Sequence, residues 1–172
     1  MRHEVAYLLD DVLQSVVDAQ PADHPLRRVD RDNSTVYETD ATIDMQQPVS
    51  KRKEDLQRAN YVGVASQSGP PPPAGPGQRY ELQSVASVRL EGLTADEFGH
   101  IHGTVRNAVP FEALFREVFA AIQAEMSYPD VGRPGVTYRD LTITNVDDAQ
   151  SEYADFHRAE FDVQFRGYTD TP

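Results

Sequence analysis

Two histidines stand close enough along the chain to share a metal ion, in His100-Ile101-His102. On an extended segment both imidazoles project to the same side, as two ligands of one ion must. A third ligand is missing at any recognisable spacing, so exposed neutral histidines are the simpler interpretation. A metal-dependent hydrolase that adds distant carboxylates to this pair is kept as an alternative hypothesis.

Acidic residues also cluster, at Asp147, Asp148, Glu152 and Asp155. Such carboxylates can hold a hard cation, but the alternating oxygen ligands and central glycine of a calcium loop are missing. The pattern favours a solvated turn over residues 147–155, with an ion-binding turn as the alternative. We expect no metal site.

The one basic cluster contains Arg27, Arg28 and Arg31, and it is surrounded by acidic side chains at Asp23, Asp30 and Asp32. Nucleic-acid contact through this cluster alone would be weak. The formal net charge of −12 argues in the same direction, because binding to nucleic acid depends on displacing its counterions with basic patches. We therefore expect no sequence-specific nucleic-acid binding.

Catalytic motifs are missing from the sequence. It has no glycine-rich phosphate loop, no Gly-x-Ser-x-Gly elbow and no His-Glu-x-x-His helix. Neither Lys51 nor Lys53 follows an acid two residues earlier, which removes the Glu-x-Lys element of metal nucleases. With no cysteine, thiolate nucleophiles, thiolate metal sites and disulfides are also excluded. We expect a protein that is not an enzyme and carries no cofactor.

The composition indicates adaptation to high salt. Acidic residues number 28, and only two of the 16 basic residues are lysines. At molar salt the Debye length falls to about 3 Å, so the repulsion within such a chain is screened. No apolar run approaches the roughly 18 residues of a membrane span, and the N-terminus lacks the apolar stretch of a signal peptide. We expect a soluble halophilic protein that is not secreted by a standard route.

Apolar periodicity predicts two amphipathic helices, over residues 3–19 and 110–125. The second carries a strict stripe of six large side chains: Phe111, Leu114, Phe115, Val118, Phe119 and Ile122. Burying them is worth on the order of 10 kcal/mol before the opposing terms are counted. This helix is therefore expected to be the main core helix.

Period-two alternation predicts strands over residues 61–66, 80–90, 136–146 and 156–168, and more weakly over 34–43. In the last strand Ala159, Phe161, Val163 and Phe165 share one face, and Arg158, Glu160, Asp162 and Arg166 share the other. His157 falls on the apolar register and is expected to be a half-buried edge residue. The polar face is expected to be too polar for a second core layer.

The strands over 61–66 and 80–90 are predicted to form a hairpin, joined by a loop at 67–78 that contains Pro70, Pro71, Pro72 and Pro73. Other long loops are expected at about 20–60, where 50–60 is a loop or a short helix, and at 92–106. The whole chain, 1–172, is expected to be one α+β domain. Its sheet would have four or five mostly antiparallel strands with both helices packed on one face.

This order of elements resembles the tail terminator family (tail-completion or head–tail joining proteins) of long-tailed viruses. The matching stretches are 3–19, Tyr61-Val62-Gly63-Val64-Ala65 with 80–90, 111–124, 136–146, and the ending from His157 to Arg166. The polar segment 21–60 is long for that family. With the acidic composition, the resemblance points to a virus of a haloarchaeon.

The resemblance implies a structural virion protein, made in the host cytoplasm and located at the head–tail junction. It would form a homo-oligomeric ring, commonly a hexamer, that ends the tail tube and joins it to the head connector, with DNA passing through the ring. A closed ring uses two different surfaces of each subunit. The expected contacts are the proline run Pro70–Pro73, the loop at 92–106, and Arg158, Glu160, Asp162 and Arg166.

Two other functions stay open. One is another neck or connector protein of the same particle. The other is a small halophilic α+β module of cellular origin, whose proline run would dock in the aromatic groove of a protein partner.

Overall fold

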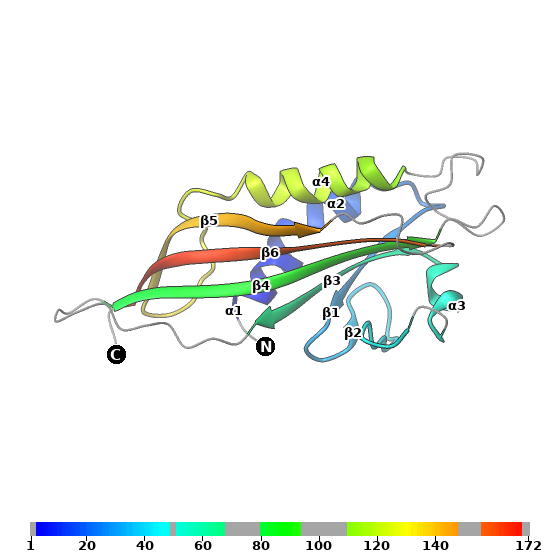
Figure 1. Ribbon diagram of the computed structural model, residues 1–172, viewed down its shortest axis with the longest axis horizontal. Coiled ribbons are helices and arrows are strands. Elements are labelled where there is room, and N and C mark those ends of the chain that lie inside the picture. The colour runs from blue at the N-terminus through cyan, green and yellow to red at the C-terminus, as the bar shows by residue number, and fades with distance from the viewer. Residues whose placement is uncertain (1–2, 49–50, 68–79, 94–109, 148–155, 170–172) are drawn as a thin grey trace.

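The computed structural model describes residues 3–48, 51–67, 80–93, 110–147 and 156–169. Within these residues the chain forms one six-stranded sheet in the order β2-β1-β3-β4-β6-β5. The fold is α+β, as predicted. The strands are β1 (Leu26–Asp30), β2 (Thr35–Val36), β3 (Asn60–Gln67), β4 (Tyr80–Leu93), β5 (Val136–Asp147) and β6 (Phe156–Thr169). Strands β4 and β6 pair with each other along their whole length (Figure 1).

The predicted hairpin and the predicted closing strand pair are both confirmed as antiparallel pairings, β3 with β4 and β5 with β6. The prediction of four or five strands is wrong, because β1 lies inside the segment that was expected to be a loop. The sheet is also mixed, since β1 runs parallel to β3. The weak strand predicted over 34–43 is only β2, with an isolated bridge between Thr35 and Thr42.

Two helical regions cover one face of the sheet, as predicted (Figure 1). The N-terminal region is α1 (His3–Ala6), the π-helix η1 (Tyr7–Val12) and α2 (Gln14–Asp18), and the other helix is α4 (Phe111–Gln123). The single helix expected over 3–19 is thus interrupted by a wider turn, closed by a bond of 2.9 Å from the Leu13 N–H to the Leu8 carbonyl. Residues 50–60 were predicted to form a loop or a short helix, and they contain the short helix α3 (Lys53–Leu56).

The main core lies between these helices and the inner face of the sheet. The predicted α4 stripe is confirmed: Phe111, Leu114, Val118 and Ile122 are buried, and the Phe115 and Phe119 rings pack against Phe161 with centroids 5.9 Å apart. The alternation of β6 is confirmed as well. The sheet contributes Val62, Val64, Leu82, Ala86, Val88, Leu90, Phe161, Val163 and Phe165 to this core.

The opposite face of the sheet, here called the outer face, has a second apolar cluster at one end. The expectation that this face is too polar for a second core layer is therefore wrong for that end. The described residues between 31 and 59 fold over this end and add Val36, Ile43, Met45, Leu56 and Ala59 to the apolar side chains of the sheet. The cluster consists of Val29, Val36, Ile43, Met45, Leu56, Ala59, Tyr61, Leu93 and Phe156.

The loops predicted at 67–78 and 92–106 begin slightly too early. Gln67 is the last residue of β3, and Gly92 and Leu93 are the last residues of β4. The rest of the loops at 67–78 and 92–106 lies outside the described residues. The same holds for residues 148–155 of the acidic turn.

Candidate interaction surface

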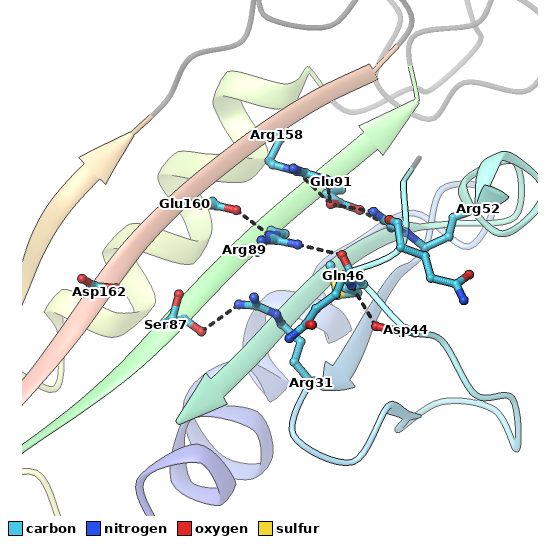
Figure 2. Close-up of polar contacts among 12 residues, drawn as sticks. Arg31, Asp44, Gln46, Arg52, Ser87, Arg89, Glu91, Arg158, Glu160 and Asp162 are labelled. Carbon is cyan, nitrogen blue, oxygen red and sulfur yellow. Dashed lines mark hydrogen bonds and ion pairs between the residues drawn. The ribbon is translucent and has the colours of Figure 1, made fainter. Parts of the chain in front are cut away.

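The four charged residues predicted to meet a neighbour all lie on β6 and on the outer face of the sheet, but in two different environments. Arg158 and Glu160 lie at the covered end, and Asp162 lies beyond them along β6 (Figure 2). Arg166 lies further along the same strand, where it pairs with Asp140. Pro70, Pro71, Pro72 and Pro73 are outside the described residues. The sequence therefore grouped residues that the fold divides.

Strand register arranges the covered end as rows of side chains across β3, β4 and β6. Glu91 lies opposite Tyr61 and Arg158, and Arg89 lies opposite Gly63 and Glu160. In the next row Ser87 lies opposite Ala65 and Asp162. Opposite charges on directly paired positions attract, so the register itself places each carboxylate beside a guanidinium.

Glu91 is the most enclosed charge of this surface, with 0% of its side chain exposed. Arg52 donates to its two carboxylate oxygens at 2.5 and 3.2 Å, and Arg158 donates to one of them at 2.9–3.0 Å. Arg52 also donates to the Gln47 carbonyl at 3.0 Å. The network therefore fastens Gln47 and Arg52 to the sheet through charge-assisted hydrogen bonds.

Arg89 makes a second attachment one row away. It donates to Glu160 at 2.5 Å and to the Met45 carbonyl at 2.7 Å (Figure 2). Arg158 and Glu160 are thus engaged within the chain. Their role as subunit contacts stays a prediction. Because their charges are already paired within the chain, they would contribute less to binding a neighbouring subunit.

Beyond the covered end, the outer face of β6 and β5 carries exposed polar side chains, which we call the open half. Asp162 accepts hydrogen bonds from Gln67 at 3.0 Å and from Asn145 at 2.8 Å, and Arg166 pairs with Asp140 at 2.9 Å. These contacts are solvent-exposed and contribute little to stability. Asp162 and Arg166 therefore stay available as contact candidates.

The outer edge of β5 borders the open half and carries apolar side chains. Met126, Tyr128 and Val146 are 52%, 67% and 48% exposed, and they are the exposed large hydrophobics of the described residues. Residues 126–128 already pair with part of this edge, through bonds of 3.0 Å between Tyr128 N and Arg139 O and between Leu141 N and Met126 O. The described chain places no strand against residues 142–147. Such an edge is a template for pairing with another chain.

Sequence reasoning did not single out Met126 and Tyr128. They follow α4 directly, and nothing in their spacing indicates whether they turn into the core or lie along an edge. Tyr128 has a positive φ of 48°, which is uncommon for an aromatic residue.

A buried polar cluster on the inner face was also not predicted. Burial alone would raise the pKa of the Glu4 carboxyl, but hydrogen bonds from Tyr138, its own backbone N–H and Arg133 lower that pKa overall. Arg133 donates to Glu4 at 2.8 Å, and the Tyr138 hydroxyl lies 3.1 Å from Ser84 Oγ. This cluster ties the N-terminal helix to β4 and β5.

His157 lies on the inner face beside α4, its ring packed edge-on against Phe111 with centroids 5.2 Å apart. It is partly buried, as predicted. On one side β6 pairs there with β4 through Gly92, whereas the described pairing of β6 with β5 reaches only to Glu160. The His157 Nδ1 is buried and has no hydrogen-bond partner among the described residues.

Acidification is expected to destabilise the protein through His157. Burial lowers the pKa of this imidazole, so the unfolded chain, with a histidine pKa of about 6.5, binds the proton more readily. Stability is then fully present above that pH and falls as the pH drops through and below it. Melting temperatures at pH 7.5 and 5.5 should differ less for His157→Phe than for the unmodified protein. An equal difference in both would contradict this role.

The residues considered as alternative metal ligands are not brought into a described site. His100 and His102 lie outside the described residues, and so do Asp148, Glu152 and Asp155. Within the part of the chain that the structure covers, no group of three or more histidines and acids is placed to hold a metal ion. In that same part, none of the helices has the length and apolar character needed to cross a membrane.

No protein-family model matches this chain, and no curated protein is significantly similar to it in sequence. A function must therefore be inferred from the surface of the protein itself. Two described surfaces support such an inference, the open half of the outer face and the apolar edge of β5.

Proposed function

We propose that this protein is a structural subunit of a homo-oligomeric ring at the head–tail junction of a long-tailed virus. In this role it ends the tail tube and joins it to the head connector. The observation that carries the proposal is the edge of β5. Met126, Tyr128 and Val146 are exposed and lie along the edge strand β5, which borders the open half of the outer face. This combination supports association through the sheet edge.

The order of elements supports the particular kind of assembly. A helical N-terminus, the β3–β4 pair, the core helix α4 and the closing β5–β6 pair follow one another as in tail terminator proteins. The segment with β1, β2 and α3 is an addition that folds onto the outer face at one end. In the strand order of the sheet, β1 and β2 lie at the end opposite to β5 (Figure 1).

A closed ring requires two different surfaces that meet head to tail. The β5 edge supplies one surface, and the open half around Asp162 and Arg166 supplies a polar surface beside it. The tail tube protein and the head connector would then bind the two ends of the ring. High acidity fits a virus that assembles in molar salt, because salt screens repulsion between subunits of net charge −12.

Removing apolar area from the β5 edge is expected to weaken the assembly. Tyr128→Ser combined with Val146→Ser should raise the dissociation constant at least about tenfold, because aromatic anchors dominate interface energies. Light scattering after gel filtration in molar potassium chloride measures the mass as a function of concentration. Glu54→Ser, a change at an exposed position on α3, serves as the control and should leave the mass unchanged.

Two results would contradict the proposal. One is an unmodified protein that stays monomeric at all concentrations in molar salt. The other is a double variant that is folded and assembles as tightly as the unmodified protein.

A further inference from the structure

The covered end of the outer face holds a cluster of four arginines. Arg31, Arg52, Arg89 and Arg158 lie there with the carboxylates of Glu91 and Glu160 (Figure 2). Glu91 accepts from two of these arginines and Glu160 accepts from a third. Arg31 is the fourth, and among the described residues no carboxylate forms a hydrogen bond or an ion pair with it.

Arg31 is held in place by its aliphatic carbons. They lie over Gly63, where an added Cβ would come 2.6 Å from Arg31 Cδ and 2.8 Å from Cγ. Because Gly63 has no side chain, the arginine stem takes the position that a side chain of β3 would otherwise occupy. The guanidinium therefore extends across the sheet toward Ser87 on β4 (Figure 2).

The hydrogen bonds of this guanidinium are incomplete. Arg31 Nη1 donates to the Ser87 carbonyl at the long distance of 3.4 Å. Its Nε is buried and has no hydrogen-bond partner in the part of the chain that the structure describes. A buried donor that lacks its partner costs free energy, and more so when the group is charged, so each such case requires an explanation such as a bound ion.

The neighbouring charges make the environment of the Arg31 guanidinium less favourable still. Burial lowers the pKa of Arg31, and the adjacent guanidinium of Arg89 lowers it further, against the smaller opposing effects of Glu160, Glu91 and Asp32. The carboxylate of Asp32 is itself taken up by the Ser66 N–H, at 3.1 and 3.2 Å. The position favours an additional negative charge.

We propose that Arg31, together with Arg89, forms a binding site for a small monovalent anion, namely chloride. The buried Nε–H would donate to the ion, and the two guanidiniums would neutralise it. A multiply charged anion is disfavoured, because it loses more hydration on partial burial and is repelled more strongly by the acidic chain. In molar salt even a weak chloride site is occupied.

Anomalous diffraction from a crystal of the unmodified protein grown in molar sodium bromide tests the site directly. Bromide takes the place of chloride and can be located by its anomalous signal. The expected result is a peak within hydrogen-bonding distance of Arg31 Nε. A well-ordered Arg31 with no peak beside it would overturn the proposal.

A second measurement works in solution. The ³⁵Cl resonance broadens when chloride exchanges with a protein site, and Arg31→Met should lose most of that excess linewidth while its stem still covers Gly63. Arg166→Met is the matched control, because it removes one arginine from the same face but one whose Nε donates to Asp140 at 2.9 Å. Equal linewidths for the two folded variants would show that no ion depends on Arg31.

Discussion

Replacing Glu91 with glutamine is expected to destabilise the protein by about 3–5 kcal/mol, the usual cost of removing one partner from a buried ion pair. Glutamine keeps the shape of the side chain but removes the carboxylate charge to which both Arg52 and Arg158 donate. Arg52 is only 4% exposed, so water cannot replace the lost carboxylate. Against a typical domain stability of about 5–15 kcal/mol, this is a large fraction.

The measurement is the free energy of unfolding in urea at constant molar salt. Asp140→Asn is the control, since it removes a carboxylate from the exposed pair with Arg166 on the same face and should cost at most about 1 kcal/mol. A triple variant, Arg52→Met, Glu91→Met and Arg158→Met, sharpens the test. It should be more stable than Glu91→Gln, because it leaves no unpaired buried charge. Equal costs for Glu91→Gln and Asp140→Asn would contradict the buried network.

Gly167→Ala is expected to have an effect of similar size for a different reason. An added Cβ would meet the Thr137 carbonyl oxygen and lie 2.6 Å from Tyr138 Cα. Both are backbone atoms of the paired strand β5, which cannot move without breaking the β5–β6 pairing. We expect a loss of about 3 kcal/mol or more, the upper range for overpacking a core.

Gly63→Ala is the appropriate comparison for that variant. The new methyl group would meet the end of Met45 and the stem of Arg31, which are flexible side chains that can shift. Thermal unfolding followed by circular dichroism should therefore show a clearly smaller fall in melting temperature for Gly63→Ala. The account of Gly167 would be wrong if that variant melted at the temperature of the unmodified protein.

The sequence predicted the parts of this fold that repeat with a clear period. The stripe on α4 and the alternation of β6 each place several large apolar residues on one side, so their elements and buried faces followed from spacing alone. β1 was missed because its five residues include Arg27 and Arg28, and it is held by parallel pairing with a distant strand. The second apolar cluster was missed because its members are scattered singly between positions 29 and 156.

The candidate surface was predictable only in part. Arg158, Glu160, Asp162 and Arg166 were placed on one polar face, which is correct. Their division into enclosed and open groups depends on where residues 31–59 fold, and no local pattern determines that. Glu91 looks like an ordinary polar strand residue until Arg52, 39 positions earlier, is brought against it. Met126 and Tyr128 gained significance only from their position beside β5.

The central claim is that this chain assembles into a ring. Electron microscopy of the unmodified protein in molar potassium chloride tests it most directly, with particle images averaged without imposed symmetry. We predict discrete closed rings of a single size with cyclic symmetry, six-fold as in the family it resembles. Particles of monomer size alone, or open filaments of indefinite length, would contradict the proposed function.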